Sequence, residues 1–376
     1  MSTLITASAI VNLPPELIDL IVDQLQRDVR ALRSCSLVCK AWLARASVHL
    51  FASFRVSCLP LCLFVLDFRG LVASSTRVSW HVCHIEVDVM PQSAADVATL
   101  AGHLPRLETL ILLGIGLFRQ NGSFEWPAAP CTGRALRRLR AVWLPVDLVS
   151  SFLGLFAAVD TLELRGPAPV MQGFSGGAHV VRHLRVDADA DEALPDVGGL
   201  VDPRTLENLV VDLGRMHGAA APERVHALLQ RAGQYVSHLE YMHALGGWTS
   251  PVDVIPALVT CSALESFTLT TPVDARTWRE SLAMLASAPP QTRHIRFVTR
   301  LDGPLPGDGA VLRDVMRALD WAVVARSLAH CRELAVVEVG LLHSAGGRVD
   351  FRARPQARDA VLESMPTWFR DVVTLA

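Results

Sequence analysis

One spacing of apolar residues recurs along most of this 376-residue chain. Its form is apolar-x-x-apolar-x-apolar, and its second half alternates as the pattern of a half-buried strand does. Copies begin 22 to 31 residues apart, except for a last interval of 42, so the chain is predicted to be an array of stacked structural repeats. The eleven copies begin at Phe51, Val82, Leu107, Leu136, Val159, Val181, Leu206, Val236, Leu264, Thr292 and Leu334.

Segments with apolar residues at helical spacing lie between these copies. Strand-then-helix repeats predict an α/β fold, a right-handed solenoid with parallel strands on its concave face and helices outside. A further helix over Ala360 to Val372 is expected to close the last exposed edge. The other expected helices are Ala94 to His103, Leu148 to Val159, Glu223 to Tyr235, Arg276 to Ala286 and Leu312 to His330.

The first fifty residues follow a different pattern, which predicts three short helices. A proline pair precedes the apolar positions Leu17, Ile21 and Leu25, and prolines are well tolerated where a helix starts. Asp28 is expected to cap the second helix and Ser36 the third. So small a bundle holds more apolar surface than it can bury, and we expect that surface to bind a partner.

The motif of this segment consists of Leu13, Pro14, Glu16, Leu17, Ile21, Leu25, Leu32, Ser36, Leu37, Val38, Cys39 and Trp42. With these residues the segment resembles an F-box, and the motif is similar to that of the large F-box families of fungi. The resemblance implies binding of a Skp-type adaptor, and through it of cullin and RING subunits. The residues expected to bind the adaptor are Leu13, Pro14, Leu17, Ile21, Leu37, Val38 and Trp42.

The repeats resemble the leucine-rich-repeat half of F-box proteins, without the asparagine usual in that repeat. We therefore expect an F-box at residues 1–50 and a leucine-rich-repeat-like solenoid at residues 51–376. The resemblance implies a noncatalytic substrate receptor of an SCF-type ubiquitin ligase, whose solenoid binds a target protein. A scaffold or regulatory protein that binds the adaptor without delivering a target for ubiquitination is the alternative.

Composition argues against several other classes. A formal net charge of −2 gives no reason to expect nucleic-acid binding. The longest apolar run, Leu59 to Leu66, is too short to span a membrane. Eight cysteines without a Cys-x-x-Cys pair, and no signal peptide, favour reduced thiols in the cytoplasm or nucleus.

Two motifs could suggest chemistry, and we expect neither to supply it. Gly173 to Gly177 matches the Gly-x-Ser-x-Gly pattern of serine hydrolases. That motif requires a strand before the serine and a helix after it, whereas here a proline-rich loop precedes the serine and a strand pattern follows it. His81 and Cys83 lie on a strand pattern that turns His84 to the opposite side, which disfavours a metal site. The chain is expected to be no enzyme and to need no cofactor or metal.

The middle residue of each strand pattern is expected to point away from the core, into the concave face. Two interpretations of this face remain open. It is either a solvated, self-neutralising surface or a polar groove that binds the target, with acidic or phosphorylated segments favoured. The residues expected to bind the target are Arg138, Arg140, Glu163, His183 and Arg185.

Lysine is almost absent from the chain, since Lys40 is the only one among 35 basic residues. Genomic composition is one explanation of this bias, because alanine, arginine, glycine and proline are all abundant, and avoidance of self-ubiquitination is the other. Whatever its origin, a receptor with one lysine offers few sites for self-ubiquitination.

Overall fold

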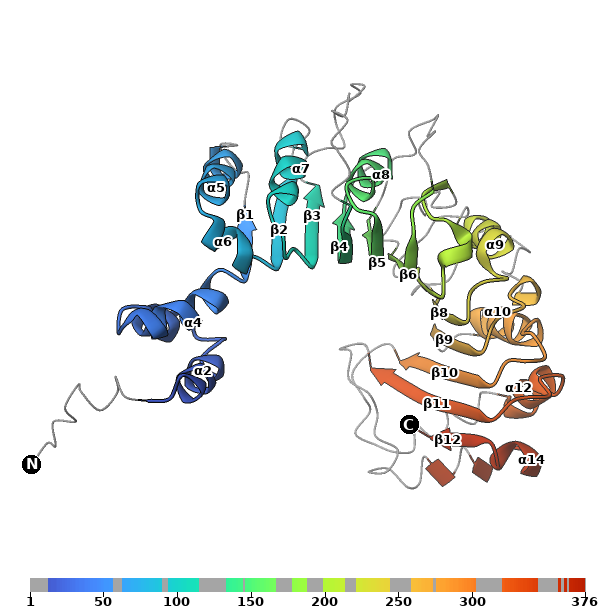
Figure 1. The fold of residues 1–376 in the computed structure, drawn as a ribbon. Helices are drawn as coiled ribbons and strands as arrows, with labels where there is room; N and C mark the ends of the chain where they lie inside the picture. Colours follow the sequence, from blue (N-terminus) through green and yellow to red (C-terminus); the bar gives the residue numbers. More distant parts are fainter. Residues whose placement is uncertain are drawn as a thin grey trace, which may run out of the picture. The chain divides into compact units, whose positions relative to one another are not determined.

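The structure, a computed structural model, is an α/β fold built around a twelve-stranded sheet (Figure 1). It describes residues 13–56, 63–89, 94–114, 133–144, 146–166, 178–187, 199–213, 221–243, 258–272, 275–301, 320–343, 358–359, 362–363 and 365–375.

The strands follow one another through the sheet in chain order, and every pairing with a defined register is parallel. The eleven strands expected from the repeat are confirmed. They are β1 (Ser53–Val56), β2 (His84–Val89), β3 (Thr109–Gly114), β4 (Ala135–Val142), β5 (Ala158–Arg165), β6 (Val181–Asp187), β7 (Asn208–Asp212), β8 (His238–Met242), β9 (Ser266–Pro272), β10 (His294–Leu301) and β11 (Val336–His343).

Helices connect many of these strands, as parallel neighbours require. All five connecting segments expected to be helical contain one in the described residues, whereas α5 and α6 were not predicted. The helices after β1 are α5 (Leu63–Ser74), α6 (Thr76–His81), α7 (Ala94–Gly102), α8 (Val146–Leu153), α9 (Ala221–Ala232), α10 (Ala275–Ala286) and α12 (Trp321–Leu328), with short 3₁₀ helices η4 (Pro203–Thr205) and η5 (Leu258–Thr260).

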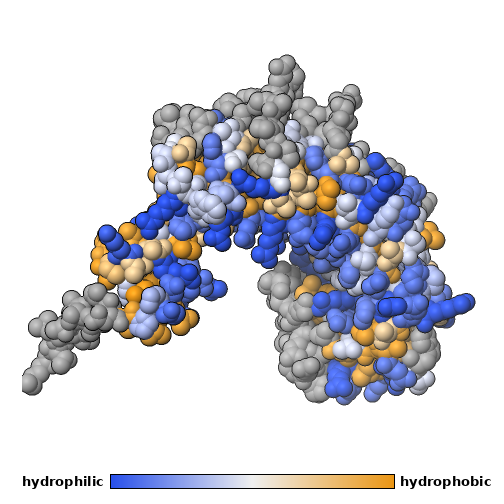
Figure 2. Space-filling view, in the orientation of Figure 1, coloured by the Kyte–Doolittle hydropathy of each residue, from blue (hydrophilic) through white to orange (hydrophobic). Residues whose placement is uncertain are grey.

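Each strand turns its repeat residues into an aliphatic core. In β7, for example, Leu209 and Val211 are fully buried while Val210 between them is partly exposed. In the second of the two units defined below, helices α8, α9, α10 and α12 lie on the buried side of the strands (Figure 1). The opposite side of the strands carries mainly hydrophilic side chains (Figure 2).

Three helices form before the sheet, namely α2 (Pro15–Gln24), α3 (Val29–Ser36) and α4 (Lys40–Leu50). Pro15 occupies the first turn of α2, and Asp28 caps α3 by accepting hydrogen bonds from two backbone N–H groups. Both expectations are confirmed. The helices share a small core of Ile18, Val22, Leu32, Cys35 and Ala46.

The chain divides into two compact units, residues 1–140 and residues 141–376. The first contains α2 to α4 together with β1 to β3, so the N-terminal helices belong to the same compact unit as the first repeats. The boundary falls inside β4. The division expected at residue 50 concerns function rather than compactness, and it stays a prediction.

Three local predictions are wrong. Ser36 is the last residue of α3 and donates a hydrogen bond to the Arg33 carbonyl, so it does not cap the next helix. His81 ends helix α6, and strand β2 begins only at His84. A single closing helix does not form, because α14 (Thr367–Arg370) leads into a twelfth strand, β12 (Val373–Leu375), which pairs with β11 and covers its edge.

An aromatic cluster fills the core of the second unit. Trp278 of α10, Phe297 of β10 and Trp321 of α12 pack edge to face, with ring centroids 5.0 to 6.2 Å apart. All three side chains are buried. They tie two successive helices to the strand between them.

Within the described ranges, every helix is too short or too polar to cross a bilayer.

Candidate functional site

Helix α2 carries apolar side chains on two sides, and only one side meets the core. Ile18 and Val22 are buried, whereas Leu17, Leu20 and Ile21 are 46%, 59% and 42% exposed. Because each is about half exposed, burying the rest would add on the order of 1 kcal/mol each, roughly half the gain for a fully exposed aliphatic side chain. The outer side of α2 is therefore an apolar surface without a described partner in the chain.

The turn between α3 and α4 extends this apolar character. Leu37 forms the C-terminal cap of α3 and is 86% exposed, and Val38 beside it is 50% exposed. The sequence pattern had placed both residues in the third helix. That helix starts only at Lys40, so Leu37 and Val38 lie in the turn before it. Figure 2 shows hydrophobic side chains at the surface of these N-terminal helices.

The seven residues expected to bind the adaptor thus fall into two groups. Leu17, Ile21, Leu37 and Val38 are exposed apolar side chains, and Pro14 is exposed just before α2. Leu13 and Trp42 instead pack partly buried against the small core. The indole N–H of Trp42 is buried without a hydrogen-bond partner among the described residues. Leu13 and Trp42 therefore contribute more to the core beneath the apolar surface than to the exposed surface itself.

Two further exposed residues, Leu20 and Leu43, were missed by the sequence interpretation. Leu20 lies on α2 three residues after Leu17, and Leu43 lies on α4 and is 37% exposed. Helical spacing from Leu17 would have identified Leu20. The pattern of α4 contains apolar residues on several sides, so spacing alone does not identify Leu43.

An ionic network fixes α2 against α4, and sequence reasoning gave no sign of it. The Asp23 carboxylate accepts a 2.7 Å hydrogen bond from Arg45 Nε and lies 2.7 Å from His49 Nε2. The hydrogen bond from Arg45, followed by that from His49, lowers the pKa of Asp23 to about 2. Asp19 adds a looser ion pair to Arg45 at 3.8 Å. The network holds the exposed side of α2 in a fixed orientation.

The second candidate site is the strand face, the side of the strands opposite the aliphatic core. Its register confirms that Glu163 lies beside Arg185 on β5 and β6, and that His183 lies beside Thr161. The two arginines expected to join them, Arg138 and Arg140, are on β4 in the first unit.

Arg185 is already paired with acids of its own face. Its Nε donates to Asp187 at 2.8 Å and its Nη2 to Asp212 at 3.4 Å. Burial of the guanidinium disfavours its charge, but Asp187, Asp212 and Glu240 outweigh that effect and raise the pKa of Arg185. The sequence interpretation considered only Glu163 as an acidic neighbour of Arg185. It missed Asp187 and Asp212, which lie two positions further along β6 and β7.

His183 also has partners on this face. Its Nε2 lies 3.8 Å from a carboxylate oxygen of Asp160, and its Nδ1 lies 2.5 Å from the amide nitrogen of Asn208. The face around β5 to β7 is therefore densely paired, which agrees with a self-neutralising surface. Binding of a target by these residues stays a prediction.

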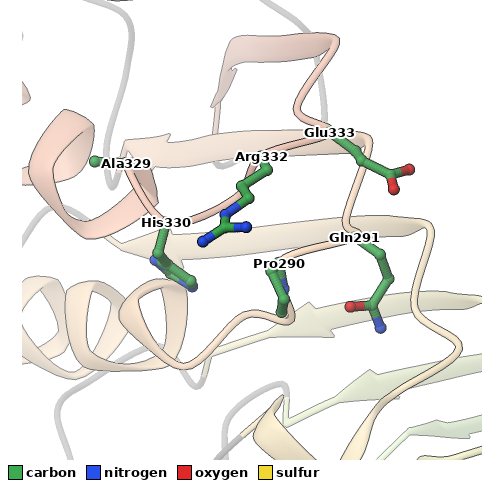
Figure 3. A pocket seen from close by; sticks show the side chains of 6 residues that line it. All are labelled: Pro290, Gln291, Ala329, His330, Arg332 and Glu333. Atoms are coloured by element: carbon green, nitrogen blue, oxygen red, sulfur yellow. The ribbon is translucent and has the colours of Figure 1, made fainter.

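A shallow pocket of about 720 Å³ lies where the chain enters β10 and β11 (Figure 3). Glu333 at its rim is held by Arg293 at 3.0 Å. The other lining residues are Pro290, Gln291, Ala329, His330 and Arg332. The guanidinium of Arg332 points between His330 and Pro290 (Figure 3). The pocket is open and four of its six lining residues are polar, whereas small-molecule sites are lined mainly by apolar side chains.

The residues that could suggest chemistry do not form a site in the described part of the chain. In these ranges, histidine, cysteine and acidic side chains do not gather in threes as a metal site would require. Ser175 of the Gly-x-Ser-x-Gly pattern lies outside the described residues.

Neither a protein-family model nor a curated protein matches this sequence. Among solved structures, the chain is similar to the leucine-rich repeat-containing protein LegL7 from Legionella pneumophila, with a TM-score of 0.40 and 9% sequence identity. The match covers 85% of this chain and 93% of that one. At this level of similarity neither activity nor partner is transferred, and the sheet topology itself establishes the α/β fold.

Proposed function

We propose that the chain is the noncatalytic substrate-recognition subunit of an SCF-type cullin–RING ubiquitin ligase. The N-terminal helices act as the F-box and bind a Skp-type adaptor. The repeats form a right-handed, leucine-rich-repeat-like solenoid whose concave strand face binds the target protein. Catalysis then requires only proximity between the target and a ubiquitin-charged enzyme. Such a subunit works in the cytoplasm or nucleus.

One observation carries this proposal. The exposed apolar residues Leu17, Ile21, Leu37 and Val38 are also residues on which the F-box resemblance rests. Packing within the chain does not account for them, because Ile18, Val22 and their neighbours make the core. Large exposed apolar side chains gathered in one small helical segment favour a protein partner.

Leu37→Asp tests the adaptor surface best, because Leu37 is 86% exposed and its replacement disturbs no core. Placing a charge in an apolar interface is expected to weaken adaptor binding by at least 2 kcal/mol, about thirtyfold in Kd. The measurement is titration of purified chain with the adaptor. Trp42→Ala is less suitable, because the indole packs against the small core.

Val259→Asp is the matched control. Val259 lies on η5 in the second unit and is 71% exposed, so it receives the same change in a comparable setting. Its Kd for the adaptor is expected to equal that of the wild type. Unchanged adaptor binding by Leu37→Asp would refute the proposed surface. If the adaptor binds but cullin is not recovered with the complex, the scaffold alternative replaces the receptor.

Target binding on the strand face has its own test. Replacing both Arg138 and Arg140 by Glu is expected to abolish target capture, measured by proximity labelling in the native cell, while adaptor binding and thermal stability stay near wild type. Retained capture would move the target site away from this face.

A further inference from the structure

Lys40 is the one lysine of this chain, and in the sequence it lies between Val38 and Trp42, two of the residues proposed to bind the adaptor. It is the first residue of α4 and is exposed. Two residues before it, Val38 is exposed, and three residues after it, Leu43 is exposed. Residues three apart on a helix are neighbours, so Lys40 and Leu43 share one side of α4.

We infer that adaptor binding covers Lys40 and so leaves the assembled receptor without a side-chain acceptor for ubiquitin. The inference rests on the proposed function, and it adds a means of protecting the receptor from its own ligase. An adaptor that buries Leu37, Val38 and Leu43 would meet the four-carbon stem of Lys40 as part of the same surface. Lysine stems pack readily along apolar surface in this way.

The chemistry of ubiquitin transfer explains why the amine matters. The deprotonated Nζ of a lysine attacks the thioester carbonyl that joins ubiquitin to the conjugating enzyme. An isopeptide bond forms, the thioester bond breaks, and the enzyme's thiolate leaves and takes up a proton. Arginine does not replace lysine here, because its guanidinium stays protonated. The other 34 basic residues, all arginine, therefore provide charge without providing acceptors.

Amine footprinting tests the inference without requiring ligase activity. The full chain, alone and in complex with the adaptor, is exposed briefly to an acetylating N-hydroxysuccinimide ester, and acetylation of Lys40 is followed by mass spectrometry. With free adaptor at ten times its Kd, roughly one chain in eleven is unbound, so acetylation of Lys40 is expected to slow about tenfold.

Arg204→Lys provides the reference amine. Arg204 is exposed on η4 in the second unit, whereas the apolar segment belongs to the first, and the change keeps its charge. Acetylation of the introduced amine is expected to be equal with and without the adaptor. This excludes a general effect of the adaptor on the reagent.

Each outcome bears on a different statement. Undiminished acetylation of Lys40 in a complex shown by size-exclusion chromatography to have formed overturns this inference and leaves the proposed function intact. Failure of the complex to form overturns both. Ubiquitin found on Lys40 after reaction of the wild-type chain in a reconstituted ligase would also overturn the inference.

Discussion

Asp23 shows how one side chain can organise the N-terminal helices. Its two carboxylate oxygens are used by Arg45 and His49, both on α4, and it stands on α2 one residue after the buried Val22. Hydrogen bonds that involve charged groups are stronger than neutral ones. The carboxylate therefore sets how α2 packs on α4, and with it the direction in which Leu17 and Ile21 point.

Asp23→Asn is expected to destabilise these helices by about 1 kcal/mol at pH 7, the value for a charged hydrogen bond reduced because the side chain is about one-third exposed. The pKa of Asp23 is about 2 in the folded chain against an ordinary 3.8. Its stabilisation is therefore fully present above pH 4 and is lost as the pH falls through about 2. Hydrogen exchange of amides in residues 15–50 measures the difference at each pH.

Asp19→Asn serves as the comparison, because Asp19 is half exposed and its oxygen lies 3.8 Å from Arg45. Exposed ion pairs of this kind contribute little. The exchange rates of this variant are expected to match the wild type within error between pH 2 and 7. Equal exchange in Asp23→Asn and wild type at pH 7 would show that the network does not support the helices.

At this scale the sequence predicts apolar positions better than it predicts their partners. Leu17, Ile21 and Leu25 were expected to form one apolar stripe, yet Leu17 and Ile21 are exposed, and Leu25 packs against the core that Ile18 and Val22 form. Both stripes have helical spacing, so periodicity cannot decide between them. Only the position of the neighbouring helices does, and that depends on contacts between residues distant in sequence.

Among the elements, the strands were the most predictable. Each of β1 to β11 has at least two apolar residues at alternate positions, and the parallel register follows once such strands stack. β12 was missed because three residues, Val373 to Leu375, carry too short a pattern. The turn between α3 and α4 was also misplaced, since Leu37 and Val38 fit a helical pattern as well as they fit a turn.

Arg185 pairs with two acids, Asp187 on its own strand and Asp212 on the next, and Arg185→Gln is expected to separate this structural role from binding. Without the guanidinium, Asp187 and Asp212, which pair in register, remain as like charges side by side. We expect a loss of about 0.5 to 1 kcal/mol in the free energy of unfolding, measured with urea. Because salt screens the repulsion, this loss of stability should become smaller as the salt concentration rises from about 0.05 M to about 0.5 M.

Arg55→Gln, at the middle position of the first strand's repeat pattern, is the control. Arg55 pairs with one acid, Glu86, at 3.4 Å, and its side chain is largely exposed. Its free energy of unfolding is expected to change by less than about 0.5 kcal/mol. An equal effect in both variants would mean that the pairing of Arg185 adds nothing beyond a surface ion pair.

At the scale of the whole chain, each strand pairs with the strands that precede and follow it in sequence. Stability in such an array is close to a sum of the repeats and of the interfaces between neighbours. A defect in one repeat should therefore loosen that repeat and its neighbours before it reaches distant ones. The two compact units give this expectation a natural internal comparison.

Trp321→Ala tests this local character. Removing a fully buried indole is expected to cost about 3 to 5 kcal/mol, because it leaves a cavity beside Trp278 and Phe297. Hydrogen exchange should accelerate in β9 to β11 and remain near wild type in β2 and β3. Trp80→Ala, on the exposed surface of α6, should leave both regions unchanged. Uniform acceleration throughout the chain would contradict an array of local interactions.

The edge-to-face packing of Trp278, Phe297 and Trp321 also has an optical consequence. Aromatic rings held at fixed angles in a packed core produce near-ultraviolet circular dichroism, which vanishes when packing is lost even if the helices persist. The signal from this cluster should therefore report the packing of the second unit, beside a contribution from the Phe51, Phe54 and Phe68 rings of the first. In the first unit Trp80 is 57% exposed, so its fluorescence should be quenched by iodide while the buried pair is spared. Iodide quenching therefore reports exposed tryptophans such as Trp80 and Trp143, and circular dichroism reports the packed aromatic cluster.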